Sequence, residues 1–130
     1  MTLLKTDKDM TIQELKDLVI TFARDRHWQR HHTPKNLTMG IVAIEAAELM
    51  EHYQWERAGE PNRDDVSDEL ADVLFYIFNF AYIENIDIAS SFMRKYEKLQ
   101  VKYPLSKFNQ DHDDLDEYRK IKKAYRQGKK

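Results

Sequence analysis

The sequence predicts an all-α protein, a four-helix bundle whose helices run mostly antiparallel to their neighbours. Three observations favour this fold. Apolar residues recur every three or four positions through most of the chain. Chain breakers are scarce, with 3 Gly and 3 Pro among 130 residues. The segments between the expected helices are short, which favours antiparallel neighbours. A chain of this length suits one domain with one core.

The first helix is expected from about residue 12 to about residue 29, after a polar tail at residues 1–10. Thr11 and Glu14 form a capping-box pattern, in which the Thr hydroxyl accepts from the amide three positions on and the Glu side chain reaches back. An apolar stripe at helical spacing then supplies a face to bury. Its members are Ile12, Leu15, Leu18, Val19, Phe22 and Ala23.

The second helix is expected from about residue 37 to about residue 57. Residues 31–36 before it are predicted to form a connecting loop, because Pro34 disfavours the helical conformation at Thr33. Gly59 is typical of the residue that follows the end of a helix.

Two more helices complete the predicted bundle. The third begins within residues 64–67, where the acidic residues suit a helix N-terminus, and it ends near Asn85. The fourth is capped by Asp87 and stops before Tyr103.

The four helices define a predicted domain at residues 11–104. Residues 105–130 form a polar and basic extension whose apolar residues are sparse. This composition predicts either a marginal helix or a mobile tail.

The composition excludes several classes of protein. Lys and Arg total 21 and Asp and Glu total 23, so the formal net charge of −2 argues against a stable nucleic-acid complex that depends on a strong positive field. The absence of cysteine excludes disulfides and thiolate metal sites. No apolar stretch approaches membrane-spanning length, and the N-terminus lacks the apolar core of a signal peptide. A cytoplasmic protein with no membrane partner is therefore expected.

Two short runs set acidic residues into apolar helical sequence. Glu45 and Glu48 lie in the second predicted helix, and Glu69 and Asp72 lie in the third. Because residues three apart point to the same side of a helix, each run presents a carboxylate pair beside an apolar face. Such pairs are common on solvated faces, but carboxylates beside apolar side chains are costly unless a positive group meets them. This context favours a metal site.

The types of ligand indicate which metal. Four carboxylates with no required imidazole suit Mg²⁺, with Mn²⁺ as the alternative. A di-iron bundle carries Glu-x-x-His motifs on two helices. Neither acidic run contains such a motif, so a di-iron site is disfavoured.

Four segments carry a resemblance to a known family. They are Trp28 with residues 32–37, residues 45–55, residues 68–76 and residues 102–104. In this order and spacing, the chain from about residue 23 to residue 104 resembles the MazG-like all-α nucleoside triphosphate pyrophosphohydrolases, closest to the dCTP pyrophosphatase branch. The Glu-x-x-Glu and Glu-x-x-Asp runs are specific together, whereas either run alone is not.

The resemblance implies Mg²⁺-dependent hydrolysis between the α and β phosphates of a nucleotide, which yields a monophosphate and pyrophosphate and would serve nucleotide-pool sanitation. The family's metal-binding and catalytic acids fall on Glu45, Glu48, Glu69 and Asp72. A bound Mg²⁺ neutralises the triphosphate and polarises the α-phosphorus. One of these acids, or Glu51, would orient the attacking water as a base, and the sequence leaves that choice open.

The resemblance also implies a nucleotide pocket. The positions that line it match Trp28, His32, Asn36, Trp55 and Tyr76. A base stacks on an aromatic face, and an amide pairs with polar groups of the base or sugar. The alternative is that the aromatic residues are core or interface side chains.

Two lysines match basic positions of the family and would hold the outer phosphates. Lys95 and Lys102 lie seven residues apart on the fourth predicted helix, so they share a face. Leu99 and Gln100 stand where the dCTP branch carries Asn and Arg, so the preferred base stays open.

The alternative function is a non-catalytic helical adaptor. In that hypothesis the aromatic faces and the basic residues 120–130 bind a partner. Either function predicts a homo-oligomer, because wide apolar stripes leave uncovered surface after one bundle closes. The resemblance implies a homodimer or homotetramer with the pocket completed across the interface.

Overall fold

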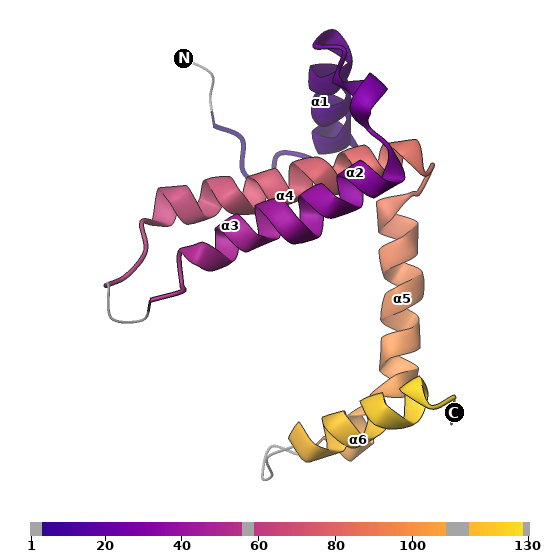
Figure 1. Ribbon diagram of the computed structural model, residues 1–130. Helices are drawn as coiled ribbons and strands as arrows, with labels where there is room; N and C mark the ends of the chain where they lie inside the picture. The colour runs from indigo at the N-terminus through magenta and orange to yellow at the C-terminus, as the bar shows by residue number, and fades with distance from the viewer. Residues whose placement is uncertain (1–3, 56–58, 109–114, 129–130) are drawn as a thin grey trace. The chain divides into compact units, whose positions relative to one another are not determined.

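The computed structural model describes residues 4–55, 59–108 and 115–128, and helices dominate these ranges (Figure 1). The elements are α1 (Ile12–Asp25), the 3₁₀ turn η1 (Trp28–His31), α2 (Pro34–Met39), the π-helical segment η2 (Gly40–Glu45), α3 (Ala46–Glu51), α4 (Arg63–Ile83), α5 (Ile88–Lys102), the 3₁₀ turn η3 (Leu105–Lys107) and α6 (Leu115–Arg126). The chain divides into two compact units, Met1–Ile88 and Ala89–Lys130.

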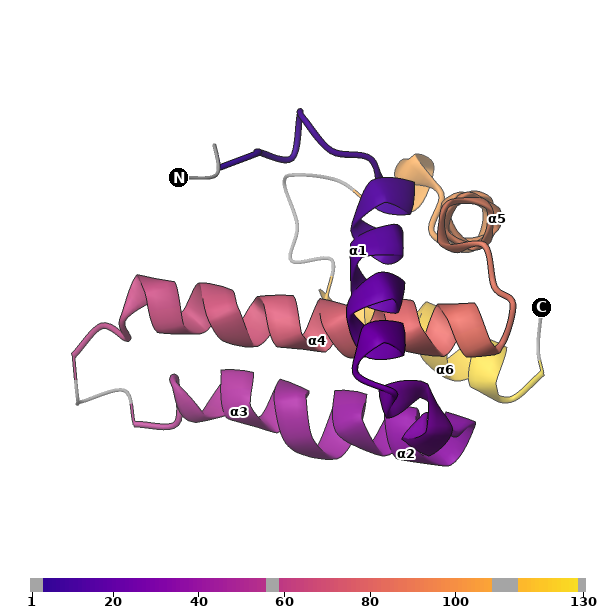
Figure 2. The same cartoon turned by 90° about the horizontal axis from the view of Figure 1, so that it is seen from above.

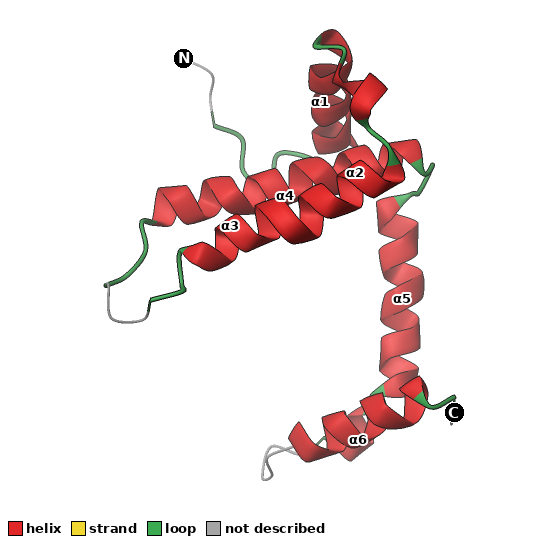
Figure 3. Cartoon of the chain, in the orientation of Figure 1, coloured by secondary structure: helices red, strands yellow, loops and turns green. Residues whose placement is uncertain are grey.

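The first unit is built on a helical hairpin. The consecutive elements α2, η2 and α3 form one rod that lies alongside α4, and α1 crosses α4 (Figures 1 and 2). No strand occurs within the described ranges (Figure 3). The all-α prediction is confirmed, whereas the four-helix bundle and the domain limits at residues 11–104 stay predictions.

The capping box at the start of α1 forms as the sequence predicted. The backbone N–H of Glu14 donates to Oγ1 of Thr11 at 3.1 Å, and the backbone N–H of Thr11 donates to Oε2 of Glu14 at 2.7 Å. The predicted end of this helix near residue 29 was wrong. His27 adopts a positive φ of 56°, which a right-handed helix cannot accommodate, so α1 ends at Asp25.

The loop predicted at residues 31–36 was also wrong, because Pro34 begins α2. Oγ1 of Thr33 accepts from the backbone N–H of Asn36 at 3.1 Å and caps the helix. Proline suits the first helical position, where its fixed φ is helical and its missing N–H would have had no helical partner. The restriction on the residue before proline holds, since Thr33 is extended with φ −93° and ψ 155°.

The rod opposite α4 changes its helical type along its length. Residues Gly40–Glu45 are π-helical, a wider winding that is rare and recurs at functional sites. The prediction that this helix reaches about residue 57 was wrong in part, because α3 ends at Glu51, while residue 57 lies outside the described ranges.

The core of the first unit is small. Ala23, Leu37, Phe78 and Ala81 are buried. Other apolar side chains remain open, among them Val42 on η2, which is 72% exposed. The expectation that a partner chain covers this apolar surface stays a prediction.

The second unit contains α5 and α6. Tyr103 stacks on Tyr118 with ring centroids 5.4 Å apart, and the ammonium of Lys102 lies 4.5 Å from the ring centroid of Tyr125. Ile121 is buried. The sequence predicted either a marginal helix or a mobile tail beyond residue 114, and the structure has a helix there, α6. Among the described residues, no helix combines the length and apolar character needed to cross a membrane.

Candidate metal and nucleotide site

Three glutamates of the first unit converge between the rod and α4. One carboxylate oxygen from each of Glu45, Glu48 and Glu69 lies within 4.8 Å of the others. Glu45 ends η2, Glu48 lies on α3 and Glu69 lies on α4. The hairpin brings together acids that are more than twenty residues apart in sequence, as the two-run pattern requires.

The cluster is electrostatically unfavourable by itself. The pKa of Glu45 is raised by burial, then by the charges of Asp72, Glu48 and Glu69, and by a hydrogen bond with Glu48. Like charges this close favour a proton or a cation among them. Asp72 thus acts on Glu45 electrostatically, although it is outside the group of three convergent acids.

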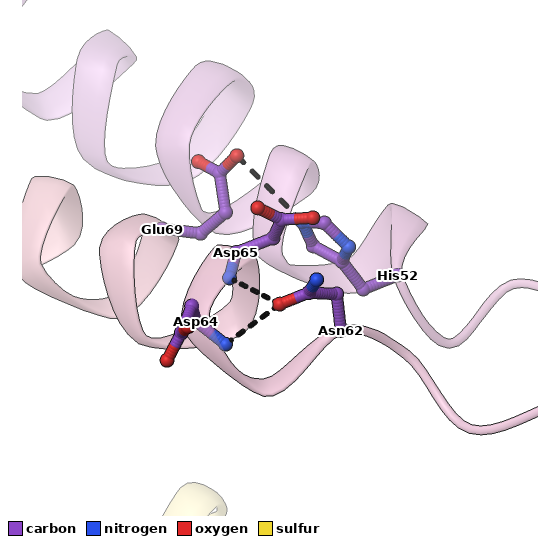
Figure 4. Close-up of polar contacts among 5 residues, drawn as sticks. All are labelled: His52, Asn62, Asp64, Asp65 and Glu69. Atoms are coloured by element: carbon purple, nitrogen blue, oxygen red, sulfur yellow. Dashed lines mark hydrogen bonds and ion pairs between the residues drawn. The ribbon is translucent and has the colours of Figure 1, made fainter.

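Glu69 provides a further test of whether a cation fits. Its Oε1 lies 3.6 Å from Nε2 of His52, and its Oε2 is buried without a hydrogen-bond partner among the described residues (Figure 4). An unpartnered carboxylate oxygen beside two other carboxylates is a donor set that a hard divalent cation satisfies. The residues therefore fit Mg²⁺ or Mn²⁺.

The start of α4 fixes the position of Glu69. Oδ1 of Asn62 accepts from the backbone N–H groups of Asp64 at 2.9 Å and Asp65 at 3.3 Å (Figure 4). With this cap α4 begins at Arg63, one residue before the range in which the sequence predicted its start. Glu69 follows less than two turns later on α4. It faces His52, which lies at the C-terminal end of the rod.

A cavity of about 340 Å³ adjoins the acids. Its wall combines carboxylates with aromatic and amide side chains. The lining residues are Phe22, Trp28, His32, Glu45, Asp72, Phe75, Tyr76 and Asn79. A neighbouring cavity of about 380 Å³ shares Trp28, His32 and Tyr76. Aromatic walls next to carboxylates that could hold a cation suit a ligand with a flat ring and phosphate groups.

The structure brings several predicted nucleotide residues to these two cavities. Trp28, His32 and Tyr76 line both, and Asn36 lines the second. The amide of Asn36 is already engaged, since its Nδ2 donates to the backbone oxygen of His31 at 3.0 Å. The alternative, that the aromatic residues are core side chains, holds in part for Trp28. Its ring packs edge-on against Phe22, with the ring centroids 5.4 Å apart.

Other predicted residues lie elsewhere. Trp55 follows α3, is 70% exposed and is not among the lining residues that the structure describes for this cavity. Lys95 and Lys102 belong to α5 in the second unit, so their contact with phosphates stays a prediction.

Sequence analysis missed Asn79 in the cavity wall. Asn79 is 1% exposed and lies on α4 seven residues after Asp72, which places both on one face. The available signal was a polar amide within the apolar stretch that follows Asp72. Phe22 and Phe75, also missed, were indistinguishable from core residues by periodicity.

Comparison with known proteins adds independent evidence. Residues 33–105 match the model of the MazG nucleotide pyrophosphohydrolase domain. The chain is 31% identical to human dCTP pyrophosphatase 1 over 102 residues and 29% identical to the Bos taurus protein over 103 residues. These alignments cover 72% and 73% of this chain, which spans about three-fifths of the length of those relatives, 59% and 60% respectively.

A solved structure is similar as well. The crystal structure of a pyrophosphatase from Archaeoglobus fulgidus matches with a TM-score of 0.64 and 33% sequence identity. The match covers 79% of this chain and 99% of that one.

Proposed function

The chain belongs to the MazG nucleotide pyrophosphohydrolase family, and on that premise we propose that it hydrolyses nucleoside triphosphates to monophosphates and pyrophosphate with Mg²⁺. Mn²⁺ is the alternative ion. The observation that carries this proposal is the convergence of Glu45, Glu48 and Glu69 beside a cavity with aromatic walls. The similarity to proteins described as dCTP pyrophosphatases and to a pyrophosphatase supports the reaction class.

The acids would hold the metal and the attacking water. Glu45, Glu48 and Glu69 supply the convergent oxygens, and Asp72 contributes from the next turn of α4. A bound Mg²⁺ neutralises phosphate charge and polarises the α-phosphorus. A carboxylate of this group, or Glu51, orients and deprotonates the water that attacks.

The aromatic end of the cavity would hold the nucleoside. Trp28 and Tyr76 offer faces on which a base stacks, and His32 and Asn36 offer polar groups beside them. Trp55 joins the nucleotide from the loop after α3, and Lys95 and Lys102 neutralise the outer phosphates. These three assignments rest on the family resemblance.

The assembly and cellular setting are part of the proposal. A homodimer or homotetramer would cover apolar side chains that a single chain leaves open, such as Val42. Hydrolysis of unwanted nucleotides in the cytoplasm would sanitise the nucleotide pool.

A nucleotide screen tests the proposal. The protein is incubated with Mg²⁺ and each canonical, methylated and oxidised nucleoside triphosphate, and released pyrophosphate is measured. Activity with at least one nucleotide, lost in Glu48→Gln at unchanged helical circular dichroism, supports the proposal. No pyrophosphate from any nucleotide, together with a melting temperature that nucleotide and Mg²⁺ leave unchanged, would favour the adaptor hypothesis.

A further inference from the structure

Asn79 is a buried polar residue with an unused hydrogen-bond acceptor. Its side chain lines the 340 Å³ cavity. Its Nδ2 donates to the backbone oxygen of Phe75 at 3.0 Å, whereas its Oδ1 is buried without a partner among the described residues. Buried amide groups are normally paired, and an unpaired one destabilises the fold. A ligand that donates a hydrogen bond to Oδ1 would explain why this residue is present.

The orientation of the amide is determined by its neighbour. Turning the amide over would set Oδ1 of Asn79 against the carbonyl oxygen of Phe75, and two acceptors repel. The oxygen is therefore the free end. A carbonyl oxygen only accepts, so a ligand must bring an N–H or O–H donor.

The position of Asn79 along α4 indicates which part of the ligand it meets. Glu69, Asp72, Tyr76 and Asn79 are spaced three, four and three residues apart and form one stripe along the helix. A rise of 1.5 Å per residue places Asn79 about 10 Å along the axis from Asp72. If the phosphates bind at the acids, the sugar would extend past Tyr76 and the base would reach Asn79.

A second buried atom in the cavity wall also lacks a partner. Nδ1 of His32 has no hydrogen bond among the described residues. Burial, and then the charge of His31, lowers the pKa of His32, so the imidazole is neutral and carries one donor and one acceptor. The cavity therefore presents two polar groups between aromatic walls. Oδ1 of Asn79 can only accept a hydrogen bond, whereas the His32 imidazole can accept or donate one, and together they suit the polar edge of a base.

We propose that Asn79 is a base-recognition residue whose Oδ1 accepts a hydrogen bond from an N–H group of the nucleotide base. The inference rests on the proposed function and names a specificity-determining contact within it. Two sources of the N–H share this chemistry, an exocyclic amino group and a ring N–H.

Binding of non-hydrolysable nucleotides to Asn79→Leu tests this inference. Titration calorimetry with Mg²⁺ and α,β-methylene analogues of dCTP, dATP, dGTP and dTTP gives the dissociation constants of the wild-type protein and the variant. Leu has a similar volume and no polar atom. The variant is expected to bind the preferred analogue about tenfold more weakly, the effect of one hydrogen bond to a buried group. Its melting temperature should equal or exceed that of the wild type, because a buried unpaired group is removed.

Matched ligands identify the donor. The 2-pyrimidinone analogue lacks the amino group of cytosine, purine lacks that of adenine, and N3-methylthymine and N1-methylguanine lack ring N–H groups. Wild type and Asn79→Leu should bind the ligand that lacks the contacted N–H with equal affinity. Ile77→Leu, a volume-conserving change on α4 at a residue outside the lining set of the cavity, is the control and should bind like the wild type.

The outcomes separate this inference from the proposed function. Equal affinity of wild type and Asn79→Leu for every analogue overturns the base contact, whatever the melting temperature of the variant. Hydrolysis would still stand. Absence of binding to the wild type by all analogues overturns both. Weaker binding by the variant without any hydrolysis by the wild type supports the contact and rejects the reaction.

Discussion

The ring of Tyr76 on α4 lies directly against Gly40 at the start of the π-helical segment. A Cβ added at Gly40 would overlap ring atoms Cδ1 and Cε1 of Tyr76. The lack of a side chain at Gly40 therefore lets the rod approach α4 at the level of the aromatic cavity. Five residues later η2 ends at Glu45, so this close approach and the acid cluster lie on the same short segment.

We expect Gly40→Ala to destabilise the protein. The added methyl group has to displace the Tyr76 ring, and overpacking of this kind costs about 1–3 kcal/mol of unfolding free energy. Urea unfolding followed by circular dichroism measures the loss.

A double-mutant cycle tests the steric cause. Tyr76→Leu removes the ring that the methyl group meets, so Gly40→Ala should cost less in the Tyr76→Leu background than in the wild type. Equal costs in both backgrounds would show that the ring is not what excludes a side chain at Gly40.

Replacement of Glu48 should weaken metal binding without destabilising the fold. Three carboxylates lie within 4.8 Å of one another, so Glu48→Gln removes one charge from a repulsive cluster. In EDTA the variant should melt at the same temperature as the wild type or higher, whereas added Mg²⁺ should raise the melting temperature of the wild type only.

Glu84→Gln is the matched control for this experiment. Glu84 is an exposed residue that directly follows α4, and the change removes the same charge from a glutamate outside the cluster of three convergent acids. If Mg²⁺ raises the melting temperature of Glu48→Gln as much as that of Glu84→Gln, Glu48 is not a metal ligand.

The raised pKa of Glu45 gives a pH dependence of defined sign. Between the ordinary value of 4.5 and the raised folded-state value, the folded protein binds more protons than the unfolded chain. The contribution of Glu45 to stability therefore decreases as pH rises through that interval. Gln resembles the protonated acid, so the unfolding free energy of Glu45→Gln minus that of the wild type should increase with pH.

Urea unfolding in EDTA from pH 4 to pH 8 measures this difference. The pKa values of Asp9 and Glu14 are lowered by hydrogen bonds to Thr6 and Thr11, and they act in the opposite direction. Their effects are common to both proteins and cancel in the difference. A difference that is flat or falls with pH would contradict the coupling of Glu45 to the other acids.

The capping box predicts a local stability effect without a direct effect on chemistry. Thr11→Ala removes the acceptor of the Glu14 backbone N–H and should lower the unfolding free energy by about 1 kcal/mol. Thr21→Ala, an exposed change within α1, should be neutral or slightly stabilising because Ala is the better helix former. Equal losses in the two variants would argue against the cap.

Much of the fold and of the acid cluster followed from local sequence rules. Helical periodicity and the capping box at Thr11 depend on near neighbours in the chain, so they can be recognised without coordinates. The acids Glu45, Glu48 and Glu69 could be selected because charged residues interrupted apolar stripes. Their meeting then required only that the two helices pack as a hairpin.

The errors in the predicted elements arose where one residue type is compatible with two local structures. Proline ends one helix or begins the next, and Pro34 begins α2 because Thr33 caps it. The sequence rules did not predict the π-helical winding at Gly40–Glu45, a segment that contacts α4. Asn79 could be recognised only when burial and the missing partner of Oδ1 were known.

In the proposed reaction, the acids of the hairpin direct hydrolysis to the bond between the α and β phosphates. The most direct measurement is ³¹P NMR of the products formed from the preferred nucleotide by wild type and Glu48→Gln with Mg²⁺. We predict nucleoside monophosphate and pyrophosphate in equal amounts from the wild type and neither product from the variant. Nucleoside diphosphate and inorganic phosphate, or full activity of Glu48→Gln, would contradict the claim.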